Sequence, residues 1–377
     1  MRVHLLTSRG LRAHSFTYAL RVFARQLKQA GFEVRLFYRD DAPKLTACDV
    51  LGVVSDYFGI KQVIARPDDL LQKLKGYRKR VRALVWFDAT AGTSALFAPA
   101  FEAVDVYAKK QLLRDRTLYK TPYYERGYHL HYYYENYGEQ LAALGEKARI
   151  VNHRGLEGWE IDRFRLSWNL GLGDYNTLGG RGRSLRPYWP IARFARGGSA
   201  ASRPDRSMHV SCRVGTKYRF PAVPFHRLEI RRLLKELAQR RDDYTIHCEG
   251  RLPYRAYRKE LEQACVAPSP FGLGEICWRD FEIFLSGALL LKPDLDHLET
   301  WPAYFEKDVT YVAHRWDFAD LQEKVEQALD DPARREAIAR AGQDRYLASL
   351  SRQGGAQFVQ RFSDLMEASL RVREPVR

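Results

Sequence analysis

The chain has 377 residues, of which 45% are hydrophobic and 13% aromatic, and it carries a formal net charge of +16. This length favours two domains over one, and this apolar content excludes a disordered chain. The positive charge leaves three kinds of partner open: nucleic acid, an anionic membrane surface or an anionic substrate. The basic residues are spread out and often paired with acids, which argues against a dedicated nucleic-acid arm.

The chain shows no pattern typical of a secreted or membrane-spanning protein. Its first residues, Met1-Arg-Val-His-Leu-Leu-Thr7, predict a strand, because too few apolar residues follow for a signal core. No apolar run is long enough to span a bilayer. Five scattered cysteines without metal-type spacing predict buried, reduced thiols. We therefore expect a cytoplasmic protein without a bound metal, whose basic surface could contact the inner face of a membrane.

The first half of the chain alternates apolar strands with helices. The predicted strands are residues 3–7, 33–38, 49–54 and 83–87. Ser15 could cap a helix over residues 16–30, which Gly31 would end. From Asp105 onward the pattern predicts a short strand that leads into a basic helix. Alternating strands and helices predict a parallel, doubly wound sheet.

A second alternation begins at Met208. It comprises strands at 208–214, 244–248, 265–267, 288–291 and 309–312, and helices at 226–239, 254–263, 317–329, 332–347 and 353–372. Residues 179–206 are rich in Arg, Gly, Ser and Pro and form the best candidate linker. The predicted fold is α/β, with two Rossmann-like domains, residues 1–195 and 207–350, facing each other across a cleft. Residues 351–377 would form a helix that could cross back onto the first domain.

The most informative segment is a glycine turn followed by a polar helix, which reads APSPFGLGEICWRDFE over residues 267–282. Backbone N–H groups at Gly272 and Gly274 could approach a diphosphate, since a turn before a helix N-terminus favours an anion. Arg279 could pair with a phosphate, and the Glu282 carboxylate could accept both hydroxyls of a ribose. The alternative is an ordinary turn with a salt-bridged helix.

From about residue 209 to 347 the chain resembles the nucleotide-binding half of GT-B glycosyltransferases, on that motif and the Gly-apolar strand behind it. The likeness is to bacterial group-one-like and exostosin-like enzymes. It implies a nucleoside-diphosphate sugar as donor substrate, no tightly bound cofactor and no essential metal. It also implies that Glu282 binds the ribose and that Glu275 lies near the first acid of the two-glutamate motif of retaining members. Six residues separate the two acids here and seven in that motif, so the stereochemistry stays open.

Residues near other predicted strand ends could complete the donor site. Arg213 and Gly215 follow the first strand of the second half, where GT-B enzymes often place a Gly and a cation against the diphosphate. Lys217 could serve the same purpose. Tyr254 or Tyr257 could stack on a nucleobase. The alternatives are a solvated strand end for the first three residues and helix packing for the tyrosines.

The catalytic base is expected in the first domain. Asp88 ends an apolar strand, where a carboxylate could take a proton from an acceptor hydroxyl. His14 is the rival, because inverting GT-B enzymes often carry a histidine in the loop before the first helix. Asp88 could instead only cap a helix, and His14 could simply be exposed. Asp294 and His297 also follow a strand end, with a plain polar loop as the alternative.

These features predict a glycosyltransferase that moves a sugar to a hydroxyl acceptor, on a bacterial surface polysaccharide or a lipid-linked saccharide. The positive charge would suit an anionic or membrane-linked acceptor. Two alternatives remain: a nucleic-acid-binding protein that uses its basic, tyrosine-rich surface, and a GT-B-fold phosphorylase or epimerase. Because no recognisable nucleic-acid-binding motif is present, we expect no nucleic acid among the partners.

Overall fold

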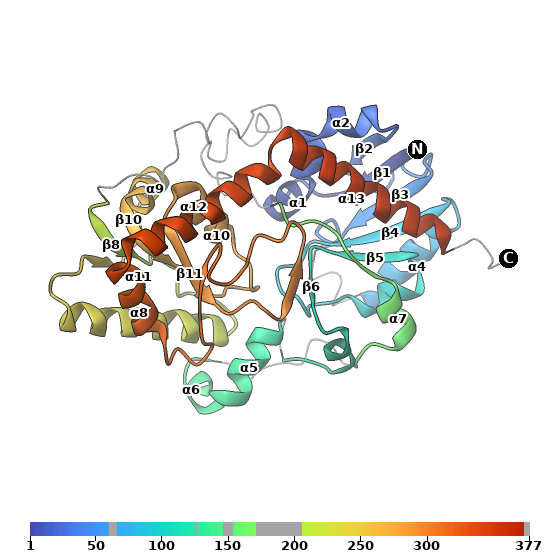
Figure 1. Ribbon diagram of the computed structural model, residues 1–377. Helices are drawn as coiled ribbons and strands as arrows, with labels where there is room; N and C mark the ends of the chain where they lie inside the picture. Colours follow the sequence, from blue (N-terminus) through green and yellow to red (C-terminus); the bar gives the residue numbers. More distant parts are fainter. Residues whose placement is uncertain (60–65, 125–126, 146–153, 171–205, 373–377) are drawn as a thin grey trace.

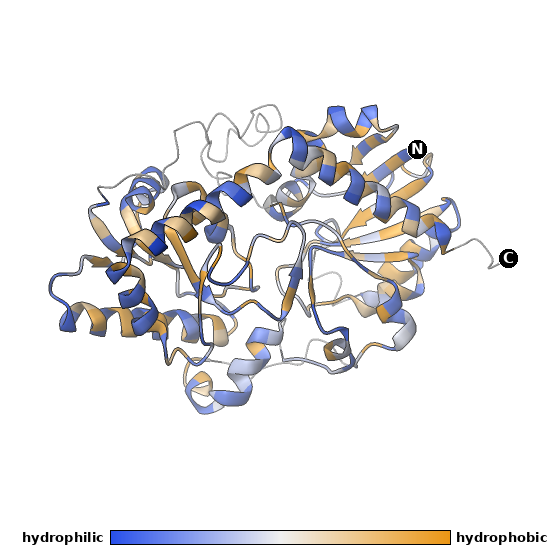
Figure 2. Ribbon diagram, viewed as in Figure 1, coloured by the Kyte–Doolittle hydropathy of each residue, from blue (hydrophilic) through white to orange (hydrophobic). Residues whose placement is uncertain are grey.

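The structure is a computed structural model that describes residues 1–59, 66–124, 127–145, 154–170 and 206–372. These residues form two lobes, each built on a parallel sheet with helices on its faces (Figure 1). Hydrophobic residues concentrate in the strands, and the outer faces of the helices are largely hydrophilic (Figure 2). The predicted fold class, two Rossmann-like halves facing each other, is therefore confirmed.

The first sheet has the strand order β2-β1-β3-β4-β5-β7. Its strands are β2 (Glu33–Phe37), β1 (Arg2–Leu6), β3 (Val50–Val54), β4 (Ala83–Asp88), β5 (Val106–Lys109) and β7 (Phe164–Leu166). Its helices include α1 (Leu11–Val22), α2 (Ala24–Gln29), α4 (Pro67–Arg78) and α7 (Gly158–Asp162). Every residue of β3 and β4 is buried, as expected for parallel strands covered on both faces.

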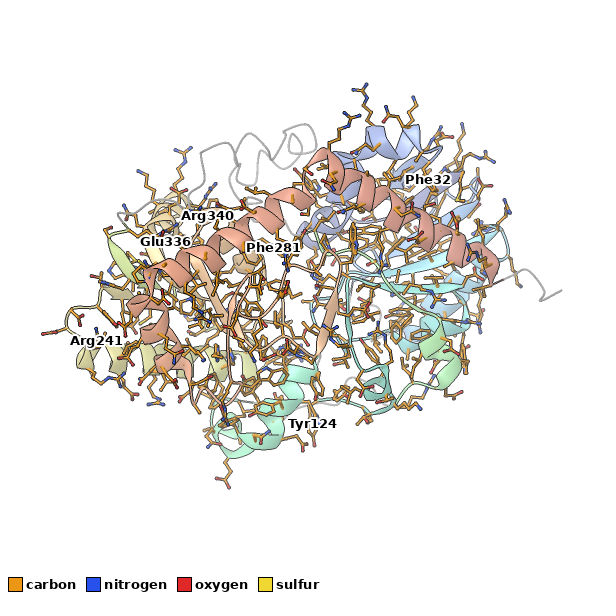
Figure 3. The ribbon with its side chains drawn as sticks, viewed as in Figure 1. Phe32, Tyr124, Arg241, Phe281, Glu336 and Arg340 are labelled. Carbon is orange, nitrogen blue, oxygen red and sulfur yellow. The ribbon has the colours of Figure 1, made fainter. Side chains whose placement is uncertain are left out.

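The second sheet has the order β13-β11-β10-β8-β9. Its strands are β13 (Val312–His314), β11 (Leu289–Pro293), β10 (Ala264–Pro268), β8 (Met208–Ser211) and β9 (Ile246–His247). The surrounding helices are α8 (Ala222–Arg240), α9 (Tyr254–Gln263), α10 (Trp278–Ser286), α11 (Leu321–Asp330) and α12 (Pro332–Ser349). The α10 helix is anchored by Phe281, whose ring lies 5.3 Å from that of Tyr346 in α12 (Figure 3).

Two further contacts join the halves of the sequence. Strand β6 (Gln111–Leu113) pairs antiparallel with β12 (Leu298–Thr300). Helices α5 (Tyr128–Asn136) and α6 (Gly138–Ala142) precede the second lobe in sequence and yet pack on α8. In this contact the ring of Tyr133 lies 5.1 Å from that of His226. The lobes are thus connected by more than the linker between them.

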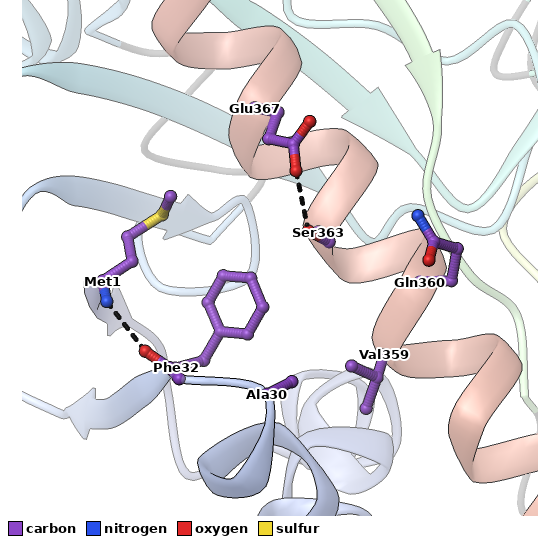
Figure 4. A pocket seen from close by; sticks show the side chains of 8 residues that line it. Met1, Ala30, Phe32, Val359, Gln360, Ser363 and Glu367 are labelled. Atoms are coloured by element: carbon purple, nitrogen blue, oxygen red, sulfur yellow. Dashed lines mark hydrogen bonds between the residues drawn. The ribbon is translucent and has the colours of Figure 1, made fainter.

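The last helix, α13 (Arg352–Arg371), crosses back onto the first lobe as predicted (Figure 1). Its Phe358 ring lies 5.4 Å from Phe23, and its Phe362 ring packs edge-on against Phe32 at 5.2 Å. A pocket of about 470 Å³ lies beside this contact, lined by Phe32 and Glu367 among others (Figure 4). It sits at the amino ends of β1 and β2, the edge opposite to the one where ligands bind in such sheets.

Several predicted elements differ from the observed ones. The first helix begins at Leu11 after an N-cap at Gly10, so Ser15 lies inside it. The basic helix predicted after Asp105 is wrong: the chain forms β5, β6 and a 3-10 turn, η2 (Arg116–Lys120). The prediction treated Lys109 as a solvent-exposed charge on a helix. In the structure this lysine is buried and paired with Asp88. Strands β7 and β12 were not predicted. The candidate linker lies outside the described residues up to position 205.

Among the described residues, no helix combines the length and the hydropathy needed to cross a bilayer. The cysteines at 48, 212, 248, 265 and 277 are all free thiols, and all but Cys277 are buried.

Candidate functional site

The carboxyl ends of the two sheets meet at the turn between β10 and α10, residues 269–276, which we name the glycine turn. A Cβ atom added to Gly274 would lie 1.9 Å from the carbonyl oxygen of Ala91, in the loop after β4. The neighbouring Glu275 accepts hydrogen bonds from the Thr93 N–H and the Gln111 Nε2, each at 3.1 Å. Ligands of open α/β sheets bind at such strand ends.

Buried cations hold the carbonyl groups of the glycine turn. The Arg227 Nε donates to Phe271 O at 3.1 Å, and the Lys292 Nζ donates to Ser269 O at 3.2 Å. Lys292 is paired with Asp280 at 3.1 Å. In the described part of the chain, by contrast, Arg227 bonds to two carbonyls and the Tyr218 hydroxyl and to no carboxylate, and it is only 8% exposed. The turn therefore lies over a buried positive charge.

The predicted residues after β8 differ in their partners. The Gly215 carbonyl accepts from Arg227 Nη1 at 2.7 Å, which ties the loop to the turn. The Arg213 Nε lies 2.9 and 2.7 Å from the two carboxylate oxygens of Glu260. Lys217 is exposed. Much of the hydrogen-bonding capacity of Arg213 is therefore used within the second lobe.

On α10, two predicted ligands are joined through a tyrosine. The Arg279 Nη1 donates to the Tyr257 hydroxyl at 2.6 Å, and this hydroxyl donates to Glu282 Oε2 at 3.0 Å. Arg279 also bonds to the backbone oxygens at the ends of β8 and β10, through Nη2 and Nε. The Tyr254 ring lies 6.3 Å from the Tyr257 ring. Burial raises the pKa of Tyr257, so its hydroxyl stays protonated and donates to Glu282.

Glu275 is engaged between the lobes. Its Oε1 lies 3.2 Å from the Nδ1 of His129 in α5, and both side chains are fully buried. Burial alone would raise the pKa of Glu275, but the nearby His129 lowers it to about 2. Burial lowers the pKa of His297 to about 4, even though Glu275 opposes this shift. The carboxylate therefore stays ionised and tied to neighbouring protein groups.

The two candidates for the catalytic base differ in accessibility. Asp88 is 1% exposed and accepts from Lys109 Nζ at 3.0 Å and from the hydroxyl of Tyr107 at 2.8 Å. Burial would raise the pKa of Asp88, but the Lys109 charge lowers it. An acceptor hydroxyl cannot reach this carboxylate in the described conformation, so its geometry does not support a role as base. His14 is partly exposed in the first turn of α1, and its role as base stays a prediction.

Two cations were not predicted as site residues. The sequence pattern marks Arg227 only as part of a helix, and Lys110 only as part of the basic segment. The available signals were a charged residue on the apolar face of the helix 226–239 and a lysine pair directly after a buried strand. Among the described residues, no group of three or more His, Cys, Asp or Glu side chains is arranged to hold a metal ion.

Comparison with known proteins gives a match within the second lobe. Residues 226–360 match the model of a family described as glycosyl transferase-like. No curated protein matches the chain.

The chain is also similar to solved structures of low sequence identity. Anabaena HepE in complex with UDP is 9% identical, with a TM-score of 0.42, and the likeness covers 98% of this chain and 100% of that one. WaaG, a glycosyltransferase involved in lipopolysaccharide biosynthesis, is 14% identical, with a TM-score of 0.39 and coverage of 97% and 99%. Sucrose-phosphate synthase from Thermosynechococcus elongatus is 12% identical, with a TM-score of 0.39 and coverage of 98% and 100%. The family match over residues 226–360 and the two facing parallel sheets support the predicted resemblance to group-1-like glycosyltransferases with a GT-B fold.

Proposed function

We propose that this protein is a glycosyltransferase that takes its sugar from a nucleoside-diphosphate sugar and transfers it to a hydroxyl group of a saccharide. The observation that carries the proposal is the chain of hydrogen bonds from Arg279 through Tyr257 to Glu282. It holds a carboxylate at the carboxyl ends of β8 and β10, beside the glycine turn. This arrangement suits a ligand with two vicinal hydroxyls next to a diphosphate.

The Glu282 carboxylate would accept hydrogen bonds from the two hydroxyls of the ribose. An ionised carboxylate has about four lone-pair sites on two oxygens, and the Tyr257 hydroxyl uses one of them. The bond from Tyr257 fixes the orientation of this carboxylate, which we propose accepts the ribose hydroxyls. Arg279 has five N–H donors, and its bonds to Pro268, Ser211 and Tyr257 use three. Its main task in this arrangement is to orient Tyr257 and Glu282.

The glycine turn would receive the diphosphate. Charge develops on the leaving diphosphate when the bond to the sugar breaks, and fixed cations stabilise that charge most where water is excluded. The turn lies over the buried Arg227 guanidinium. If the transfer inverts the anomeric carbon, His14 would take the acceptor proton from the first-lobe side. A bacterial surface glycan or a lipid-linked saccharide would suit the charge of +16.

A thermal-shift screen with UDP, GDP, CMP and their sugars tests the donor. A ligand that binds only the native state raises Tm, so one nucleotide class should raise it and the others should not. Glu282→Ala should then weaken binding of that nucleotide roughly 10- to 100-fold, because charge-assisted hydrogen bonds are worth about 1.5–3 kcal/mol each. Glu323→Ala, on the exposed face of α11, removes one negative charge away from the turn and is the matched control. If the Glu282→Ala variant binds the nucleotide with unchanged affinity, the assignment of Glu282 to the ribose is wrong.

A further inference from the structure

We propose that Lys110 from the first lobe and Arg227 from the second are the two cations that bind the donor diphosphate. This inference rests on the proposed function and assigns the diphosphate to residues other than Arg213 and Arg279. Those two arginines are engaged in hydrogen bonds within the second lobe, to Glu260 and to the Tyr257 hydroxyl respectively.

Arg227 has the geometry of an anion ligand. Its Nε and Nη1 are fixed by the carbonyls of Phe271 and Gly215. Its Nη2 makes no hydrogen bond to another described residue and lies 3.1 Å from where a Cβ of Gly272 would be. That Cβ would also lie 3.0 Å from the Sγ of Cys277, the N-cap of α10. A buried guanidinium without a carboxylate is costly, and a bound phosphate would supply the missing partner.

Lys110 lies in the first lobe, next in sequence to a residue that contacts the glycine turn. Its neighbours in sequence are fixed on either side: Lys109 by the ion pair with Asp88, and Gln111 by Glu275 of the glycine turn. Lys110 lies at a bend between the end of β5 and the start of β6. Within the described residues Lys110 makes no ion pair or hydrogen bond, although it is only partly exposed.

The electrostatics agree with this placement. Burial and the charge of Lys109 lower the pKa of Lys110 to about 8, with Cys277 and Arg12 among the other groups that act on it. Burial raises the pKa of the Cys277 thiol, and the charges of Lys292, Arg227 and Lys110 act in the opposite direction. Arg227 lies at the start of α10, and Gln111, the neighbour of Lys110, contacts Glu275 just before it. The helix N-terminus adds its own preference for an anion there.

Calorimetric titration of the full-length protein with inorganic pyrophosphate tests the pair independently of the nucleobase. Lys110→Met should weaken pyrophosphate and nucleoside-diphosphate binding about tenfold or more, and Lys110→Arg should retain most of the affinity. Binding of the nucleoside without phosphates should not change in either variant. Arg227→Lys keeps the buried charge and should lose affinity less than Arg227→Met, whose folding is checked by its melting transition. Lys28→Met, an exposed charge loss on α2, is the control.

The outcomes separate the two proposals. If no nucleoside diphosphate binds the unaltered protein, the proposed function fails. If nucleoside diphosphates bind and Lys110→Met binds pyrophosphate and nucleoside diphosphate as tightly as the Lys28→Met control, the proposed function stands and the assignment of Lys110 is overturned. An Arg227→Met variant that folds and keeps full affinity would overturn the assignment of Arg227 in the same way.

Discussion

Glu275 Oε1 lies 3.2 Å from His129 Nδ1, and both side chains are fully buried between the lobes. The other carboxylate oxygen accepts from Thr93 and Gln111, so one side chain ties α5, the loop after β4 and strand β6 to the glycine turn. This ionised group therefore helps to fix the relative position of the lobes, together with the β6–β12 pair and helix α13. Removing it should affect stability and donor binding together.

Acid should loosen this junction in two stages. The pKa of His297 is about 4 in the folded protein, against an ordinary value of 6.5. As the pH falls, the unfolded chain therefore takes up this proton before the folded protein does, and the free energy of unfolding decreases between pH 6.5 and 4. The pKa of Glu275 is about 2 against an ordinary 4.5, so its contribution is present above 4.5 and is lost as the pH falls toward 2. Urea unfolding between pH 7 and 3 should show a lower free energy of unfolding at each step. His297→Gln should flatten the upper part of the profile; an unchanged slope would contradict the assignment.

Glu275→Gln should lower the free energy of unfolding at pH 7 by about 3–5 kcal/mol if the pair with His129 is charged, the usual cost of breaking a buried ion pair. The amide can still accept from Thr93 or Gln111, so the fold should persist. Urea denaturation gives the free energy, and nucleotide titration gives the affinity. Glu336→Gln, on the surface of α12, should change neither. A stable variant that loses only catalysis would instead indicate that Glu275 acts on the donor sugar.

Gly274→Ala should disrupt the junction without changing charge. The added Cβ would lie 1.9 Å from the Ala91 carbonyl oxygen, so one of the two backbones must move. We expect a lower Tm and weaker nucleotide binding. Gly76→Ala, in α4 with open space around the new Cβ, should by contrast raise stability by about 0.5–1 kcal/mol. Equal melting temperatures for the two variants would show that the lobes adjust freely at this turn.

The strand-helix alternation was predictable because it follows from local apolar runs. Helix α9 matches its predicted range, 254–263, and β4 differs by one residue. The antiparallel pair of β6 with β12 could not be predicted, since its partners are far apart in the sequence and each strand is three residues long. The same holds for α5, whose packing on α8 depends on tertiary contacts such as Tyr133 with His226.

The chemistry of the site was predictable only in part. The glycine turn and Glu282 stand out by residue type and spacing, and the structure places them at the strand ends. Residue type alone could not show that Asp88 is neutralised by Lys109, or that Arg213 is paired with Glu260. These pairings arise from the register of β4 with β5 and from the packing of α9 on β8. A cation becomes a ligand candidate only when it has no carboxylate partner, as is the case for Arg227 and Lys110 among the residues that the structure describes.

Asp88→Asn separates a structural role from a catalytic one. The substitution leaves Lys109 buried without its counter-ion, and breaking a buried pair in this way costs about 3–5 kcal/mol. We expect a large drop in Tm. Asp88→Asn combined with Lys109→Met should recover part of the stability, because neither charge is then left alone. A variant with normal Tm and no transfer activity would instead support the role of Asp88 as base.

The charge state of Lys110 should make donor binding depend on pH. Its pKa of about 8 in the free protein means that the ammonium loses its proton as the pH rises through 8. A bound diphosphate favours the charged form and raises this pKa, so affinity should fall between pH 7.5 and 9.5 in calorimetric titrations. Lys110→Arg keeps its charge throughout this range and should bind with a nearly constant affinity.

The lowered pKa also means that the charged lysine destabilises the free fold at pH 7, so Lys110→Met should melt at the same or a higher temperature without ligand. A variant that binds weakly and also melts lower would point to a structural role for the lysine instead.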